Sequence, residues 1–208
     1  MMVANSLLSG LILAGGEGRR MAGRDKGLIS LVQKPLVEYA IDCLAPLVDD
    51  LTISCNRNRA LYQDYQLDCI SDETVESVEG YQGPMAGLAA GLQHAKHEWL
   101  LVMPCDTPLM TSQVMAQLSA CLNSNTSNDS PQAIIFSHQG LQPLHGLYHR
   151  SMLPIFEQCL AENKNALQRL LRSLDRVVIH QGLACELSFN NANDPEELAI
   201  IATLLGKN

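Results

Sequence analysis

The chain has 208 residues, and its 22 acidic and 14 basic side chains give a formal net charge of −8 at pH 7. This charge, together with an aromatic fraction of only 4%, argues against a broad binding surface for nucleic acid or anionic membranes. The 47% of apolar and 17% of charged residues argue against a disordered chain, and the length suits one domain. We therefore expect a single globular domain over residues 1–208.

Short apolar segments of strand length alternate along the chain with segments whose apolar residues recur at helical spacing. The predicted strands are residues 7–14, 51–55, 67–70, 99–103 and 133–137, and the predicted helices are residues 36–47, 86–95, 113–122, 152–160 and 194–205. A polar stretch at residues 123–131 is predicted to be a surface loop. This alternation predicts an α/β fold with three layers, α/β/α, built on a mostly parallel, doubly wound sheet.

Seven cysteines are spread along the chain without a C-x-x-C pair. Their odd number and wide spacing suit neither a disulfide framework nor a zinc site, and are typical of buried thiols in a reducing compartment. No segment approaches the roughly 18 consecutive apolar residues that a membrane span needs, and the apolar N-terminal segment lacks the basic flank of a secretion signal. We therefore predict a cytoplasmic protein.

A glycine-rich turn follows the first predicted strand. Gly15, Gly16 and Gly18 can bring backbone N–H groups close to an anion. The turn is neither a P-loop nor a dinucleotide-binding fingerprint, because both spacings fail. An ordinary tight turn explains the glycines equally well. The basic residues that follow, Arg20 and Lys26 foremost, favour a phosphate-binding loop, with a solvated charged loop as the alternative.

Asp106 directly follows an apolar predicted strand, at the edge of the sheet where ligands bind in open α/β folds. A single Asp in this position more often caps a helix, although Thr111 or Ser112 can supply that cap. No carboxylate or cysteine completes a metal-ligand set with His94 and His97, and we interpret them as helix surface rather than as a metal pair.

Polar residues also follow other predicted strands. Asn56 and Asp72 each follow a predicted strand, where a carboxylate can accept hydrogen bonds from a ligand and an amide offers both polarities. Asn191 and Asn193 would point the same way in an extended segment. Capping of the last helix by Asn193 or Asp194 is the alternative for that segment.

The run L-A-G-G-E-G-R-R-M-A-G-R-D-K-G at residues 13–27 resembles the signature L-A-G-G-x-x-x-R-M-G-x-D-K of nucleotidyltransferases. The whole chain resembles the molybdenum cofactor guanylyltransferase family, through segments that occur in the same order. These segments are residues 34–36, 56–57, 72, 83–87, 104–108, 142–148 and 191–198. One departure is Ala22, which stands where glycine is usual and slightly restricts the loop.

The resemblance implies a Rossmann-like nucleotidyltransferase domain whose N-terminal half binds the nucleotide and whose C-terminal half binds the acceptor. It implies transfer of GMP from GTP to the phosphate of molybdopterin bearing molybdenum, with release of pyrophosphate. The family's nucleotide-binding positions match Leu13, Ala14, Gly15, Gly16, Lys26, Asn56, Asp72 and Asp106. Its acceptor-binding region matches Pro143, His145, Tyr148 and Asn191, although a strand with one satisfied histidine explains that segment equally well.

For catalysis, the resemblance implies that Lys26 and Arg20 neutralise the phosphates and that Mg²⁺ binds at Asp106, with Asn191 as a second candidate ligand. The acceptor phosphate is already largely a dianion at neutral pH, so orientation and charge neutralisation are the main requirements. Transient contacts with cofactor-delivering proteins and with apo-molybdoenzymes are also implied.

Two alternatives remain at this stage. One is a related cytidylyltransferase or sugar-phosphate nucleotidyltransferase, which would share the glycine loop and Asp106. The other is a nucleotide-binding regulator or carrier without turnover.

Overall fold

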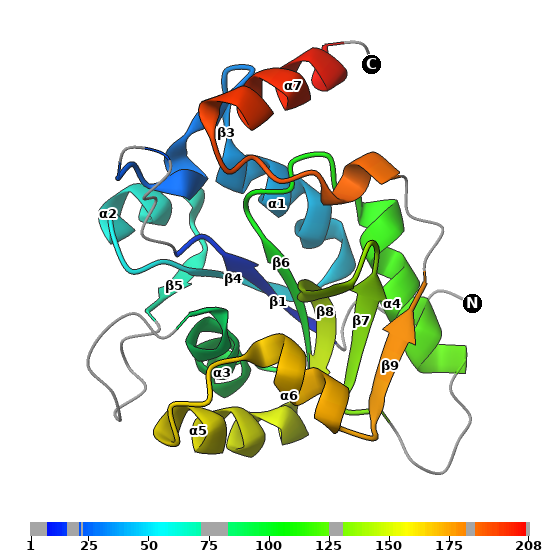
Figure 1. The fold of residues 1–208 in the computed structure, drawn as a ribbon. Helices are drawn as coiled ribbons and strands as arrows, with labels where there is room; N and C mark the ends of the chain where they lie inside the picture. Colours follow the sequence, from blue (N-terminus) through cyan, green and yellow to red (C-terminus); the bar gives the residue numbers. More distant parts are fainter. Residues whose placement is uncertain are drawn as a thin grey trace.

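The computed structural model describes residues 8–15, 21, 23–71, 83–124, 131–181 and 186–206. A seven-stranded sheet runs through this part of the chain in the order β5-β4-β1-β6-β8-β7-β9 (Figure 1). Its strands are β1 (Leu8–Leu13), β4 (Asp50–Ser54), β5 (Asp68–Ile70), β6 (Trp99–Pro104), β7 (Ala133–Ser137), β8 (Leu141–His149) and β9 (Val177–His180). A separate pair consists of β2 (Ser30–Leu31) and β3 (Lys34–Pro35).

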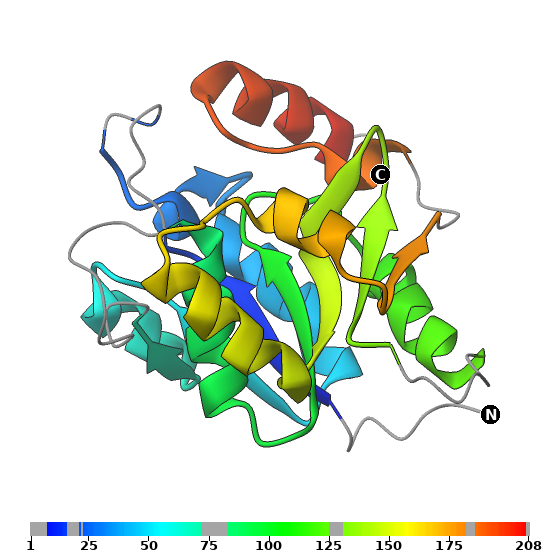
Figure 2. The same cartoon turned by 60° about the horizontal axis from the view of Figure 1, so that its bottom comes forward.

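Helices lie on both faces of the sheet. The helices of the described residues are α1 (Leu36–Leu44), α2 (Arg59–Tyr62), α3 (Pro84–His94), α4 (Ser112–Ser124), α5 (Leu153–Ala161), α6 (Leu167–Ser173) and α7 (Pro195–Leu205). Helices α1 and α4 lie on one face, and α3, α5 and α6 lie on the other (Figures 1 and 2). The predicted three-layer α/β/α fold is confirmed.

The central strand β1 is buried on both faces, which explains its nearly continuous apolar sequence. Leu8 and Ile12 pack into the core on the α1 and α4 side, whereas Leu11 and Leu13 pack into the core on the α3 and α5 side. This alternation follows from the two-residue period of a strand. Two hydrophobic layers therefore meet at one sheet.

Six of the seven strands share one direction, and β8 is antiparallel to both of its neighbours. The sheet is mostly parallel, as predicted, but the sequence did not predict the reversed strand. Only a short turn separates β7 from β8, with Gln139 at φ 51° and Gly140 at φ 127°. So short a connection allows an antiparallel pair only, because a parallel pair needs a long crossover.

Several elements were not predicted, namely β2, β3, β9, α2 and α6. Strand β9 has only four residues, so its run of three apolar residues is too short to stand out in the sequence, and it is only partly buried. Residues 123 and 124 of the predicted polar loop belong to α4, and residues 125–130 lie outside the described residues.

Helix α7 covers neither face of the sheet and lies beyond the edge at which the parallel strands end (Figure 2). Its residue Ile201 is buried in a third hydrophobic cluster with Met21, Leu31 and Leu36. The side chain of Asp194 accepts hydrogen bonds from the N–H groups of Glu196 and Glu197, so the predicted cap of this helix is confirmed. The cluster brings the C-terminal segment next to the segment that follows β1.

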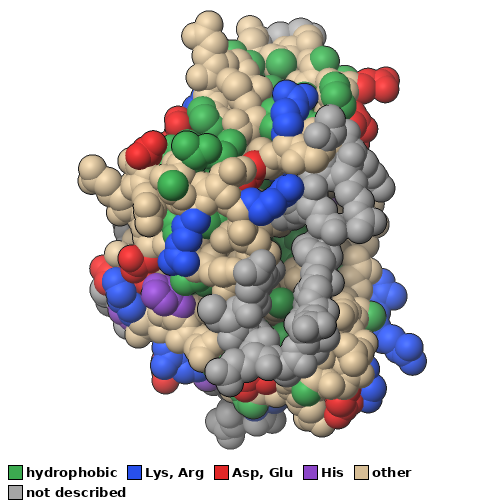
Figure 3. All heavy atoms as spheres, turned by 90° about the vertical axis from the view of Figure 1, so that its left-hand side faces the viewer, with side chains coloured by type: hydrophobic (Ala, Val, Ile, Leu, Met, Phe, Trp, Pro, Cys, Tyr) green, Lys and Arg blue, Asp and Glu red, His purple; other side chains and the backbone are tan. Residues whose placement is uncertain are grey.

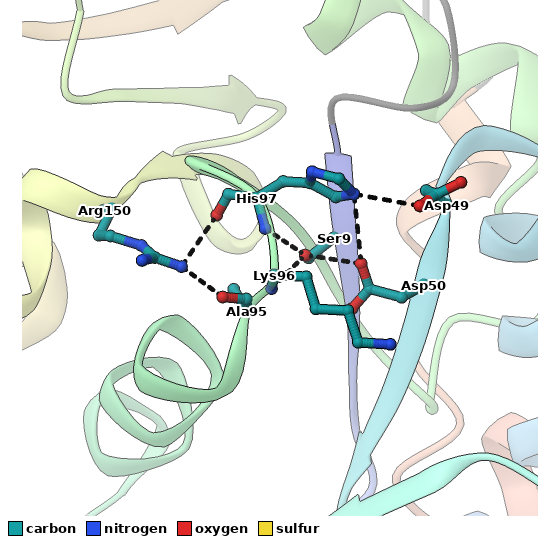
Figure 4. Close-up of polar contacts among 7 residues, drawn as sticks. All are labelled: Ser9, Asp49, Asp50, Ala95, Lys96, His97 and Arg150. Atoms are coloured by element: carbon teal, nitrogen blue, oxygen red, sulfur yellow. Dashed lines mark hydrogen bonds and ion pairs between the residues drawn. The ribbon is translucent and has the colours of Figure 1, made fainter.

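At the opposite end of the parallel strands, where they begin, Ser9 of β1 is hydrogen-bonded to β4 and to the loop before β6 (Figure 4). Its hydroxyl accepts from the N–H groups of Lys96 and His97 at 3.0 and 3.1 Å, and donates to Asp50 Oδ1 at 2.9 Å. His97 Nε2 lies 3.2 Å from Asp49 Oδ2 and 3.6 Å from Asp50 Oδ1. The interpretation of His97 as helix surface was wrong, because the fold supplies carboxylates that are distant in the sequence.

No helix among the described residues is long and apolar enough to cross a membrane. No disulfide joins the six described cysteines, and Cys43, Cys55, Cys69 and Cys105 are buried, as the sequence predicts for structural thiols.

Replacing Ser9 by Ala tests the contacts in Figure 4. Ser9 is 1% exposed. Removing its hydroxyl takes one hydrogen-bond partner from each of two backbone N–H groups and one carboxylate oxygen, in buried surroundings where water does not easily replace it. We expect the free energy of unfolding in urea to fall by about 1–3 kcal/mol. Ser173→Ala, at an exposed position at the end of α6, is the control and should change it by less than about 0.5 kcal/mol. Equal effects of the two substitutions would contradict the prediction.

Candidate active site

The carboxyl ends of β1, β4 and β6 meet at one edge of the sheet, where open α/β folds bind ligands. The carbonyl of Leu13 accepts from Cys105 N at 3.1 Å, and the N–H of Ala14 donates to Ser54 O at 2.9 Å. Gly15 comes next and is exposed. The glycine turn therefore begins directly where three strands end.

Asn56 lies beside this turn. A Cβ atom at Gly15 would be 3.7 Å from Asn56 Nδ2. Ser71, the last described residue after β5, donates to Asn56 Oδ1 at 3.2 Å. The structure thus brings together Gly15, Asn56 and the residue that precedes Asp72. Gly16, Arg20 and Asp72 themselves lie outside the described residues.

Lys26 and Asp106 form the centre of the site. Lys26 Nζ lies 2.5 Å from Asp106 Oδ2 and 2.6 Å from Asn193 Oδ1. The side chains of Lys26 and Asp106 are each 18% exposed, so their charges interact in a partly dehydrated setting. Asp106 and Asn193 lie 80 and 167 positions after Lys26 in the sequence, and both contact its ammonium group.

Asn193 is a site residue that the sequence-based prediction did not rank. Its backbone N–H donates to Glu197 Oε2 at 2.7 Å, and its side chain accepts from Lys26. The helix cap that we considered for it is made by Asp194 instead. The spacing of Asn191 and Asn193 was the available signal, because alternate residues in an extended segment point to the same side.

The segment of Lys26 is held by its neighbours. Asp25 accepts from the Tyr62 hydroxyl at 2.5 Å and from Asn58 Nδ2 at 3.1 Å. Burial and the adjacent Asp25 raise the pKa of Tyr62, so this phenol stays a neutral donor. A Cβ atom at Gly27 would lie 2.4 Å from the Tyr62 hydroxyl, which explains the glycine after Lys26. Tyr62 and Asn58 were not predicted as parts of the site.

Asp106 retains an unused oxygen. Its Oδ1 is buried and has no hydrogen-bond partner, and a buried carboxylate oxygen of this kind is suited to a cation or a ligand. Its backbone carbonyl accepts from Ala192 N at 2.8 Å, which ties the adjacent Asn191 to the end of β6. Asp106 does not serve as the cap of α4, because Thr111 Oγ1 accepts from Val114 N at 3.3 Å.

The chemistry of these donors fits Mg²⁺. Carboxylate and amide oxygens are the protein ligands that this ion takes, and Asp106 and Asn191 line the same pocket. Burial is the main cause that raises the pKa of the neighbouring Cys105 thiol, so no thiolate competes as a soft ligand.

A pocket of about 430 Å³ opens beside Asp106. It is lined by Pro84, Pro104, Asp106, Leu141, Gln142, Pro143, Leu144, His145, Asn165, Ala166, Leu167, Gln168 and Asn191. Three of the four predicted acceptor residues, Pro143, His145 and Asn191, are among them. Residues 165–168 were not predicted, because their contribution depends on how the start of α6 packs against β8.

The structure does not bring Tyr148 into this pocket. Its side chain is fully buried among the residues under α5, and its hydroxyl donates to the carbonyl of Pro143 at 2.5 Å. Residues 141–145 all line the pocket, so simple strand alternation does not decide which residues reach it; the register shift between β7 and β8 interrupts the alternation before Tyr148. Tyr148 therefore supports the pocket wall from within the core.

His145 is a buried histidine with one partner. Its Nε2 lies 2.9 Å from Thr107 Oγ1, and its Nδ1 has no partner. Its ring contacts that of Phe189 edge to face, with centroids 5.2 Å apart. Burial lowers the pKa of His145 to about 4, outweighing the opposite effect of the Asp106 charge. The imidazole is therefore neutral at physiological pH.

Basic and acidic side chains are interspersed on the face seen in Figure 3 and form no continuous basic patch among the described residues there. Among the described residues of this face, attraction for a polyanion therefore comes from separate cations and not from one basic patch.

A mostly parallel α/β/α sheet that gathers a glycine turn, a lysine and a carboxylate at one edge is the arrangement of a nucleotidyltransferase. The chain belongs to the MobA-like NTP transferase family, whose domain profile matches residues 10–177.

It is 40% identical to a molybdenum cofactor guanylyltransferase of Pseudomonas putida over 192 residues, which are 90% of this chain and 94% of that protein. The molybdenum cofactor guanylyltransferase of Vibrio cholerae is 36% identical over 198 residues, covering 94% of this chain and 92% of that protein. The solved structure of molybdopterin-guanine dinucleotide biosynthesis protein A from Archaeoglobus fulgidus shares the fold, with a TM-score of 0.77 at 22% identity, over 96% of this chain and 100% of that one.

The protonation of His145 predicts how stability depends on pH. The pKa of His145 in the folded protein, about 4, lies below the ordinary value of 6.5. Between pH 4 and pH 6.5, His145 is therefore protonated in the unfolded chain but mostly neutral in the folded protein. The free energy of unfolding should therefore decrease as the pH falls from about 6.5 towards 4, by up to about 3 kcal/mol from this group.

Urea denaturation at pH 7 and pH 4.5 measures this contribution, with His145→Gln as the comparison because glutamine does not titrate. We expect the wild type to lose about 2–3 kcal/mol more than the variant over this interval. Equal losses would show that His145 takes up its proton as readily in the folded state as in the unfolded chain.

Proposed function

We propose that this nucleotidyltransferase transfers GMP from GTP to the phosphate of molybdopterin bearing molybdenum, forming the guanine dinucleotide cofactor and pyrophosphate. The observation that carries the proposal is the meeting of Lys26 and Asp106 at 2.5 Å, between the glycine turn and the pocket of about 430 Å³. The identity of 40% to a curated molybdenum cofactor guanylyltransferase supports the choice of nucleotide and acceptor.

The nucleotide lies on the glycine-turn side of Asp106. Backbone groups of Leu13, Ala14, Gly15 and Gly16 approach it, and Lys26 with Arg20 neutralises the phosphates. Asn56 and Asp72 recognise guanine or ribose, and the hydrogen bond from Ser71, the residue before Asp72, to Asn56 supports this assignment.

The family generally uses a divalent metal ion, and we propose that the ion of this protein is Mg²⁺. Asp106 would hold it, together with Asn191. When bound, Mg²⁺ supplies positive charge that offsets the negative charge developing on the phosphates. The unpartnered Oδ1 of Asp106 supports this assignment.

The reaction then needs little from the protein besides placement. An oxygen of the acceptor phosphate forms a bond to the α-phosphorus of GTP as the bond to the pyrophosphate oxygen breaks. No proton has to be removed first, because the phosphate monoester is largely a dianion near pH 7. Lys26, which contacts Asp106, neutralises the negative charge of the departing pyrophosphate. The pocket positions the acceptor.

We further propose that residues 1–208 form one domain, with nucleotide contacts in the first half and acceptor contacts in the second. The single sheet that contains both β1 and β8 supports this division. Unpaired thiols such as Cys43 and Cys105 support a reducing, cytoplasmic setting. There the enzyme would exchange its substrate and product with cofactor-delivering proteins and apo-molybdoenzymes in transient contacts.

Lys26→Ala and Asp106→Ala test the central pair. Each should lower the rate of GMP transfer by roughly 100-fold or more, because each removes one preorganised charge partner. The fold should remain, as judged by circular dichroism and the melting temperature. Lys96→Ala and Asp68→Ala, at exposed positions away from the pocket, are matched controls that should retain normal rates. Near-normal transfer by either site variant would remove that residue from the mechanism.

A nucleotide panel followed by thermal shift, with and without Mg²⁺, tests the assignment of GTP. At equal excess the preferred nucleotide raises the melting temperature most, because it binds only the folded state. We expect GTP with Mg²⁺ to give the largest shift. A larger shift with CTP or UTP would favour a related cytidylyl- or sugar-phosphate nucleotidyltransferase. GTP binding without pyrophosphate release in the presence of the authentic acceptor would favour a carrier.

A further inference from the structure

Two atoms of the pocket wall stand out by lacking partners. Among the described residues, Asp106 Oδ1 and His145 Nδ1 are the buried side-chain oxygen and nitrogen atoms without a hydrogen bond. Both residues line the same pocket. An unsatisfied buried polar atom destabilises a folded protein, and such atoms at a cavity are explained when a ligand supplies the missing partner.

The rest of the lining indicates which part of a ligand this wall meets. Besides Asp106 and His145, the polar side chains of the pocket are the neutral amides Gln142, Asn165, Gln168 and Asn191, and no Lys or Arg of the described part of the chain lines it. Prolines and leucines supply apolar surface. A neutral, flat heteroaromatic ring with polar edges suits such a lining, whereas a phosphate would need a cation. Lys26, which contacts Asp106 but does not line the pocket, is suited to the phosphate end.

His145 is fixed before any ligand arrives. Thr107, 1% exposed, binds its Nε2 at 2.9 Å, and Phe189 contacts the ring edge to face. Thr107 directly follows Asp106, so the imidazole is anchored to the same turn that carries the carboxylate. Because Nε2 is occupied, Nδ1 is the ring nitrogen left to bind a ligand.

We propose that His145 is a specificity-determining residue of the acceptor site, whose Nδ1 hydrogen-bonds the heteroaromatic ring of the acceptor, and that Thr107 is the positioning residue that orients it. The proposal rests on the proposed function, since that function makes the ligand of this pocket a pterin. It adds which atom contacts the ring and which residue presents that atom.

Two conservative substitutions separate a ligand contact from a structural one. The amide of asparagine reaches approximately the place of Nδ1 but not that of Nε2, whereas the longer glutamine reaches approximately the place of Nε2. His145→Asn therefore keeps a polar atom toward the pocket and loses the contact to Thr107. His145→Gln keeps the contact to Thr107 and loses the atom toward the pocket.

Steady-state kinetics with molybdenum-bearing molybdopterin and GTP read out the difference. We expect His145→Gln to raise KM for the acceptor roughly tenfold, the effect of losing one buried hydrogen bond, with kcat and KM for GTP unchanged. His145→Asn should raise KM for the acceptor less than His145→Gln does, to about the same extent as Thr107→Val, because both keep the polar atom toward the pocket and lose only the contact that orients it. Thr107→Val, which removes the hydroxyl at similar volume, should raise KM for the acceptor without altering KM for GTP.

The opposite order, with His145→Asn impaired and His145→Gln normal, would overturn the proposal, because the histidine would then serve only to hold Thr107. Normal KM values in both variants would overturn it as well. Should the variants unfold, NMR of wild-type protein labelled with [¹⁵N]histidine decides. The Nδ1 resonance of His145 must shift on addition of the acceptor while Nε2 changes little, and an unchanged Nδ1 would refute the contact.

Failure of the proposed function would look different. In that case the wild type itself would release no pyrophosphate from GTP and the acceptor. A shift of the Nδ1 resonance with the acceptor would still support the ring contact, whereas no shift would count against it.

Discussion

The contact between Lys26 and Asp106 is the interaction on which the site depends. It joins the loop after β1 to the end of β6, and Asn193 adds the segment before α7. The lysine is itself restrained, because Asp25 beside it is held by Tyr62. With both partners largely withdrawn from water, the opposite charges hold each other in place more strongly than they would on the surface. In the proposed mechanism, the groups that meet the polyanionic substrate are therefore preorganised, which is what electrostatic catalysis requires.

This short-range arrangement matters because the protein as a whole is acidic, with a formal charge of −8. Nucleotide and phosphorylated acceptor are themselves anions, and the net field of the molecule does not attract them. Salt confines electrostatic attraction at the surface to about 8 Å, so individual cations at the edge of the sheet must provide it. The same acidity disfavours nonspecific binding of nucleic acid, and a guanylyltransferase has no use for such binding.

The two edges of the sheet differ in how completely their polar groups are satisfied. Where the parallel strands begin, the Ser9 hydroxyl donates a hydrogen bond to Asp50 and accepts from two backbone N–H groups, so these contacts stabilise the fold. At the other edge, Asp106 and His145 each retain a buried atom without a partner. Departures from full satisfaction are expected at functional sites, where a ligand completes the set. The structure thus separates a stabilising edge from a binding edge.

The sequence by itself determined the α/β alternation and the strands β1, β4, β5, β6 and β7, and it singled out Lys26 and Asp106 as candidate site residues. These follow from local signals, since strands buried on both faces read as apolar runs and a glycine turn precedes the lysine. Only the tertiary structure decided that β8 runs backwards, that Asn193 binds Lys26, and that Tyr148 supports the pocket from the core instead of lining it. Each of these depends on contacts between segments distant in sequence or on how one strand pairs with its neighbours, and side-chain partners across such distances leave no periodic pattern in the sequence.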